Sequence, residues 1–126
     1  MMSRLEALAE EMIAEISGAG LEKIRESERR FIEYVTFTDV DEIIEMLNVV
    51  IDRDWMALPP WVRNLSYRLA FLQRTEDPKL LREAGADLYK SGPDWDEIAD
   101  SLEQRAEELE RIVEIERPGE PRPNRP

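Results

Sequence analysis

The segment at residues 55–73, WMALPPWVRNLSYRLAFLQ, limits the possible folds more than any other part of the chain. It contains two of the three tryptophans and no acidic residue, although the 126-residue chain carries a formal net charge of −12. Pro59 and Pro60 suit the first turn of a helix, where a missing N–H group costs little. A helix this apolar predicts a central position in the fold. The apolar side chains that share one face of this helix are Trp61, Val62, Leu65, Leu69 and Leu72.

Apolar side chains recur at helical spacing in five other segments, so we expect an all-α protein with about six helices. Helix starts near residues 3, 39 and 78 indicate three hairpins in a compact bundle. An acidic turn followed by Pro-x-Val-Arg at 60–63 resembles one HEAT unit, so a short α-solenoid is the alternative. The expected helices cover residues 3–17, 21–35, 39–54, 59–73, 78–91 and 94–117.

The chain is long enough for one domain with a hydrophobic core, and we place that domain at residues 1–117. The remaining residues 118–126, PGEPRPNRP, include four prolines and no side chain suited to a core. Such a composition predicts a disordered or polyproline-like tail.

The composition excludes several classes of function. The chain has no cysteine and no histidine, which rules out disulfides, thiolate or imidazole catalysis and the common zinc sites. Its acidic balance disfavours binding to nucleic acids and to anionic membranes. No signal-peptide pattern and no apolar run of membrane-spanning length is present, so we expect a cytoplasmic protein. Fourteen arginines against three lysines indicate a GC-rich bacterial genome.

Acidic residues recur at helical spacing in the segment 94–117 and form what we call the acidic ridge. Like charges four residues apart repel each other, so the ridge is not optimised for helix stability. We expect it to face solvent as a docking strip for a basic partner protein. The alternatives are a merely solvated face or a face paired with the basic residues of 21–35. The ridge consists of Asp96, Asp100, Glu103, Glu107, Glu110 and Glu114.

Basic and aromatic residues form a second candidate interaction site in the central helix. Arg63, Tyr67 and Arg74 lie along one side of that helix, opposite its apolar face. Arginine suits an acidic partner or a small anion, and intramolecular ion pairs are the alternative.

A third feature is Glu28, which falls within the apolar arc of 21–35 and should need a partner for its buried charge. We expect a partly buried pair between Glu28 and Arg68.

Two pairs of acidic residues, Glu42 with Glu45 and Glu97 with Asp100, could place carboxylates on adjacent helical turns. These Glu-x-x-Glu and Glu-x-x-Asp motifs resemble those of the all-α, magnesium-dependent nucleotide pyrophosphohydrolases. The resemblance implies a metal-dependent hydrolase. Here, however, a whole helix pair separates the two motifs, and a metal site needs several converging oxygens. We therefore expect no catalytic residue, no metal site and no cofactor.

The sequence as a whole favours a noncatalytic, acidic, helical protein-interaction module. An inhibitor of a basic partner, of the immunity or antitoxin kind, is the sharper form of this hypothesis. The alternatives are the hydrolase and a structural protein that forms a homodimer through residues 94–117. No nucleic acid and no membrane is expected among its partners.

Overall fold

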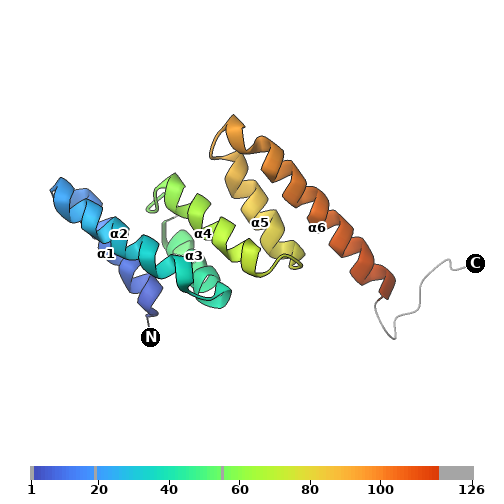
Figure 1. Cartoon of the computed structure of the whole chain (residues 1–126), viewed down its shortest axis with the longest axis horizontal. Helices are drawn as coiled ribbons and strands as arrows, with labels where there is room; N and C mark the ends of the chain where they lie inside the picture. The colour runs from blue at the N-terminus through green and yellow to red at the C-terminus, as the bar shows by residue number, and fades with distance from the viewer. Residues whose placement is uncertain (1, 19, 55, 117–126) are drawn as a thin grey trace, which may run out of the picture.

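The computed structural model describes residues 2–18, 20–54 and 56–116, and in these ranges the protein is all-α (Figure 1). The predicted fold of six helices is confirmed, whereas the predicted tail at 118–126 lies outside the described residues. A short 3-10 helix, η1, precedes the last α-helix. The elements are α1 (Arg4–Gly18), α2 (Leu21–Phe37), α3 (Val40–Asp54), α4 (Pro60–Gln73), α5 (Pro78–Tyr89), η1 (Pro93–Trp95) and α6 (Asp96–Glu116).

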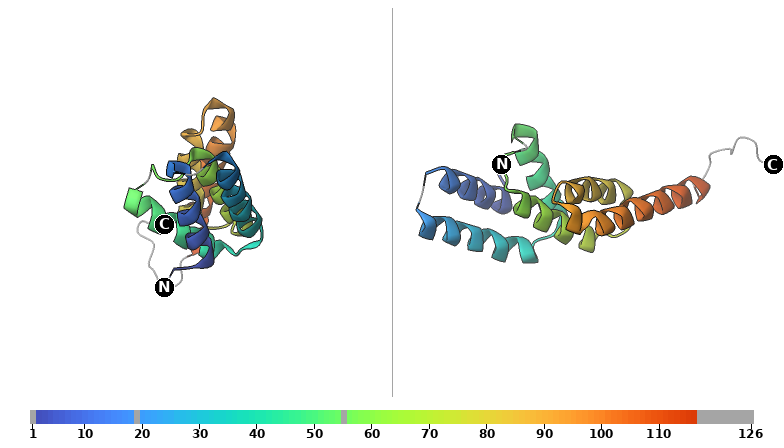
Figure 2. Two further views of the ribbon diagram at one scale, coloured as in Figure 1. Left: turned by 90° about the vertical axis from the view of Figure 1, so that its left-hand side faces the viewer. Right: turned by 90° about the horizontal axis from the view of Figure 1, so that it is seen from above.

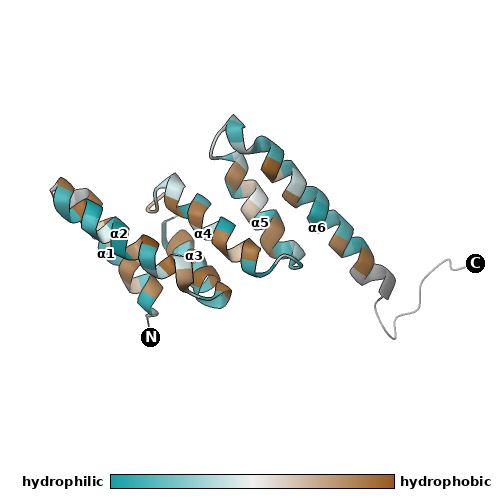
Figure 3. Cartoon of the chain, viewed as in Figure 1, coloured by the Kyte–Doolittle hydropathy of each residue, from teal (hydrophilic) through white to brown (hydrophobic). Residues whose placement is uncertain are grey.

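The helices pack mainly as neighbours along the chain, with α4 in the middle of the series (Figures 1 and 2). Helix α1 packs on α2 and α3, α4 packs on α3 and α5, and α5 packs on α6. Figure 3 shows hydrophobic and hydrophilic residues alternating around each helix, as amphipathic helices require. These contacts make the predicted helical bundle, and the solenoid alternative is not needed to describe them.

Side-chain caps at three helix starts explain why the expected boundaries were close to the observed ones. The Ser3 hydroxyl accepts a hydrogen bond from the Glu6 amide (3.1 Å), and Asp39 Oδ1 accepts one from the Glu42 amide (2.9 Å). At the start of α5, Asp77 Oδ1 accepts a hydrogen bond from the Leu80 amide (3.2 Å). Each cap satisfies a backbone N–H group that the helix itself leaves unpaired.

Three helix boundaries differ from the prediction by two residues. The helix expected at 21–35 continues to Phe37, with Thr38 as its C-cap, and the helix expected at 78–91 ends at Tyr89. The segment 94–117 was expected to begin as one helix, but the chain first makes η1, and α6 begins at Asp96. All three differences concern single turns at helix ends, where the pattern of apolar residues carries the least information.

Helices α5 and α6 approach each other closely at Gly85. A Cβ atom added there would lie 3.2 Å from Glu103 Oε1 and 3.3 Å from the Ala99 carbonyl oxygen. The glycine therefore lets the two backbones pack at short range, and α6 has α5 as its principal neighbour. No helix of the described residues is long and apolar enough to span a membrane.

Candidate docking groove

Helix α4 buries only part of the face that its apolar residues predict: Val62 is buried and Leu65 and Leu69 are partly buried. Trp61 is 39% exposed and Leu72 is 66% exposed, so the prediction that both point into the core is wrong. The reason is that α3 and α5 both pack on α4 and cover the strip between them. Small side chains in this strip allow close approach between helices. The buried residues of α4 are Val62, Arg63, Asn64, Ser66, Tyr67 and Ala70.

Polar side chains of α4 are therefore buried against α5. Arg63 is 7% exposed, and its Nε donates a hydrogen bond to Asp87 Oδ1 at 2.8 Å. Its Nη1 donates to the Leu58 carbonyl oxygen at 3.0 Å. Tyr67 lies beside this ion pair, and burial, followed by the nearby charges of Glu83 and Asp87, raises its pKa to about 12. A buried guanidinium needs such partners, because an unpaired charge in the interior is very costly.

The predicted basic and aromatic patch is consequently not a surface feature. Arg63 and Tyr67 are buried, whereas Arg74 lies at the C-terminal end of α4. There Arg74 Nη2 pairs with Asp41 Oδ1 at 2.6 Å, and its Nη1 lies 3.9 Å from Asp77 Oδ2. The structure thus favours the alternative of intramolecular ion pairs for these residues.

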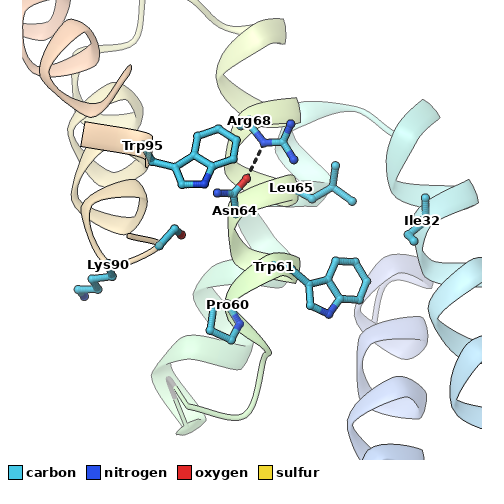
Figure 4. Close-up of a pocket in the computed structure, with 9 residues that line it drawn as sticks. Ile32, Pro60, Trp61, Asn64, Leu65, Arg68, Lys90 and Trp95 are labelled. Carbon is cyan, nitrogen blue, oxygen red and sulfur yellow. Dashed lines mark hydrogen bonds between the residues drawn. The ribbon is translucent and has the colours of Figure 1, made fainter. Parts of the chain in front are cut away.

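The apolar edge of α4 lines a groove of about 620 Å³ between α2, α4 and the turn that joins α5 to η1. Trp61 and Leu65 lie on α4, and Trp95 projects from η1 across Asn64 and Arg68 (Figure 4). The other lining residues complete a surface that is mostly apolar but contains two basic side chains. We call this the docking groove: Ile32, Pro60, Trp61, Asn64, Leu65, Arg68, Lys90, Ser91 and Trp95.

Arg68 is half-buried in the docking groove and does not make the contact expected from the sequence. Its Nε donates to Asn64 Oδ1 at 2.6 Å, and its guanidinium carbon lies 5.2 Å from the centre of the Trp95 ring. Among the described residues, no ion pair joins it to Glu28, so the predicted buried pair does not form. Helix α2 does contact α4, but the half-buried Glu28 is not the residue that holds them together.

The acidic ridge is partly tied to α5 rather than free in solvent. Arg82 pairs with Glu103 (2.8 Å) and with Glu110 (2.5 Å), and the hydrogen bond from Arg82 lowers the pKa of Glu110. The Tyr89 hydroxyl donates to Asp100, which raises the pKa of Tyr89 to about 12. Of the other three members, Asp96 and Glu107 are exposed, and the side chain of Glu114 lies outside the described ones.

In the first of the two carboxylate motifs that resemble a hydrolase, Glu42 has a structural role. Both oxygens of Glu42 are used for structure: Oε2 accepts from the Leu5 amide (2.9 Å), and Oε1 accepts from the hydroxyls of Tyr34 (3.2 Å) and Thr38 (3.0 Å). This carboxylate therefore joins α1, α2 and α3. In the described part of the chain, no three acidic side chains gather into a group that could hold a metal ion. The resemblance remains a prediction from motif spacing.

Comparisons with family models, with curated proteins and with solved structures found no match to this chain.

Sequence reasoning missed several residues of the site. Asp87 lies on α5 as the partner of Arg63, and the apolar pattern of residues 78–91 does not distinguish it from an exposed acidic residue. Trp95 belongs to the segment 94–117, which was expected to be one helix, yet it lines the docking groove from η1. One usable signal existed: Val62, Ser66 and Ala70 repeat every four residues as a row of small side chains, which suits close packing between helices.

We predict strong coupling between Arg63 and Asp87. Asp87→Leu or Arg63→Met alone strands a buried charge and should cost about 3–5 kcal/mol of the free energy of unfolding, whereas the double variant should cost far less than the sum. Chemical denaturation of the four proteins measures the coupling. Additive single effects would mean that the pair does not hold α4 against α5.

We also predict that the acidic ridge stabilises the fold through Arg82. Replacing Glu103 and Glu110 with Lys removes both carboxylates that Arg82 contacts and adds like charges beside it. The double variant should unfold at a lower denaturant concentration than the parent, and the difference should shrink in high salt. Glu107→Lys is the matched control and should change stability little. A double variant more stable than the parent would show that the ridge is dominated by its own repulsion.

Proposed function

We propose that the protein is a noncatalytic protein-interaction module that binds a partner segment in the docking groove. The observation that carries this proposal is the position of Trp61 and Trp95, which line one groove from two different elements. Tryptophan and arginine are the residues most often found at the energetic centre of protein interfaces. The groove brings two tryptophans and Arg68 together on one surface.

The architecture around the groove supports this proposal. Trp61 and Leu65 belong to α4, which is held between α3 and α5 and anchored by the buried Arg63–Asp87 pair. Binding residues on a rigid helix lose little conformational freedom when a partner docks, so more of the contact energy is available as affinity. A segment that covers Trp61 would also remove exposed apolar surface from water.

The acidic ridge is a weaker candidate for the docking surface. Arg82 and Tyr89 already engage Asp100, Glu103 and Glu110, so a basic partner would have to compete with contacts inside the protein. An inhibitor of a basic partner, of the immunity or antitoxin kind, is a narrower form of our proposal. It would use the net charge of −12 to attract the partner over a distance, with the groove as the point of attachment.

Selection from a random dodecapeptide library on the immobilised protein tests the proposal. We expect peptides that bind the parent and that bind the Trp61→Ala/Leu65→Ala variant at least tenfold more weakly, because the apolar floor of the groove is lost. Phe37→Ala is the matched control, since Phe37 is 89% exposed and lies outside the groove. The proposal fails if no peptide is selected, or if the selected peptides bind the groove variant as well as they bind the parent.

A further inference from the structure

We infer that the docking groove selects a partner segment that combines a large apolar side chain with a single carboxylate, and that Arg68 binds this carboxylate. This inference rests on the proposed function and adds the chemistry of the partner to it. It is carried by the state of Arg68 and by the charges that line the groove.

The guanidinium of Arg68 is held in place but only partly used. Its Nε is engaged by Asn64 and its carbon lies over the ring of Trp95, so one hydrogen bond and one stacking contact set its orientation. Its Nη1 and Nη2 atoms make no hydrogen bond within the described residues. Arginine presents these terminal groups as a planar fork that matches a carboxylate. A half-buried fork of this kind is prepared for an acceptor from outside.

The charges around the groove point to the same ligand. The lining residues of the groove include Arg68 and no acidic side chain, although the chain contains 29 acidic residues. A carboxylate here would meet positive charge beside apolar walls, where electrostatic attraction is screened less than in bulk water. A basic segment would meet charge of its own sign.

The geometry also limits how acidic the partner segment can be. The whole protein carries a net charge of −12, so a run of acidic residues would be repelled before it reached the groove. One carboxylate among apolar residues avoids most of this repulsion. Trp61 precedes Arg68 by two helical turns, which corresponds to about 10 Å along α4. An extended partner would bridge this distance with an apolar residue and an acidic residue about three positions apart.

The experiment uses the dodecapeptides selected on the parent and versions in which each Asp or Glu is replaced by Asn or Gln. We expect most selected peptides to contain one acidic residue near an apolar one, and we expect neutralisation to weaken binding to the parent about tenfold or more. Binding to Arg68→Gln should be weak for both versions and should no longer depend on the carboxylate. Arg68→Lys keeps the charge but lacks the planar fork, so its affinity for the peptides should lie between those of the parent and of Arg68→Gln. The control is Arg111→Gln on the exposed surface of α6, which should behave as the parent does.

The outcomes separate this inference from the proposed function. Peptides that need Trp61 but bind equally well without their carboxylate would overturn the inference and leave the docking groove intact. Basic peptides, or binding that Arg68→Gln does not alter, would overturn it as well. If the only occupant of the groove is a second copy of this chain, the protein will dimerise in solution and Trp61→Ala will abolish the dimer, which also contradicts the inference. Failure to select any groove-dependent peptide removes both proposals.

Discussion

The buried ion pair between Arg63 and Asp87 is the interaction on which the arrangement of α4 depends. Both side chains are less than one-tenth exposed, and removing two charges from water is unfavourable unless each finds its partner. The requirement that Arg63 face α5 sets the rotation of α4 about its own axis. Once that rotation is set, the small residues Ser66 and Ala70 lie inside, and the large apolar residues of the opposite edge cannot all be buried. The stability of the centre and the exposure of Trp61 are thus two results of one contact.

This arrangement separates the surfaces of the molecule into two kinds. On α6, acidic residues are held by Arg82 and Tyr89 of α5, so part of the negative charge serves to join the last two helices. Between α2, α4 and η1, the surface is mostly apolar and includes Arg68. Of these two surfaces, we propose the docking groove as the one that binds a partner, because the terminal nitrogens of Arg68 make no hydrogen bond within the described residues.

The number, order and approximate limits of the helices could be predicted from the sequence. The spacing of apolar residues, capping residues such as Ser3 and Asp39, and prolines such as Pro78 all act within the helix that they define. The sequence did not predict how the helices are rotated. An apolar face shows which residues could be buried, but the residues that are buried depend on which helices pack on that element, and α4 contacts α2, α3 and α5. The pairing of Glu28 with Arg68 failed for the same reason, since it assumed that the apolar face of α4 points inward. Asp87 and Trp95 could not be assigned to sites because their contacts with side chains of another helix, α4, determine their roles.

The rotation of α4 is the central claim, and cysteine reactivity tests it most directly because the chain has no cysteine of its own. Ser66→Cys places a thiol at a fully buried position, and Leu72→Cys places one at a position that is 66% exposed. We predict that the thiol of the Leu72→Cys variant reacts with Ellman's reagent nearly as fast as in the unfolded chain, while the thiol of the Ser66→Cys variant is strongly protected until the protein unfolds. A reactive thiol in Ser66→Cys together with a protected one in Leu72→Cys would place the apolar edge of α4 in the core and contradict this rotation of α4.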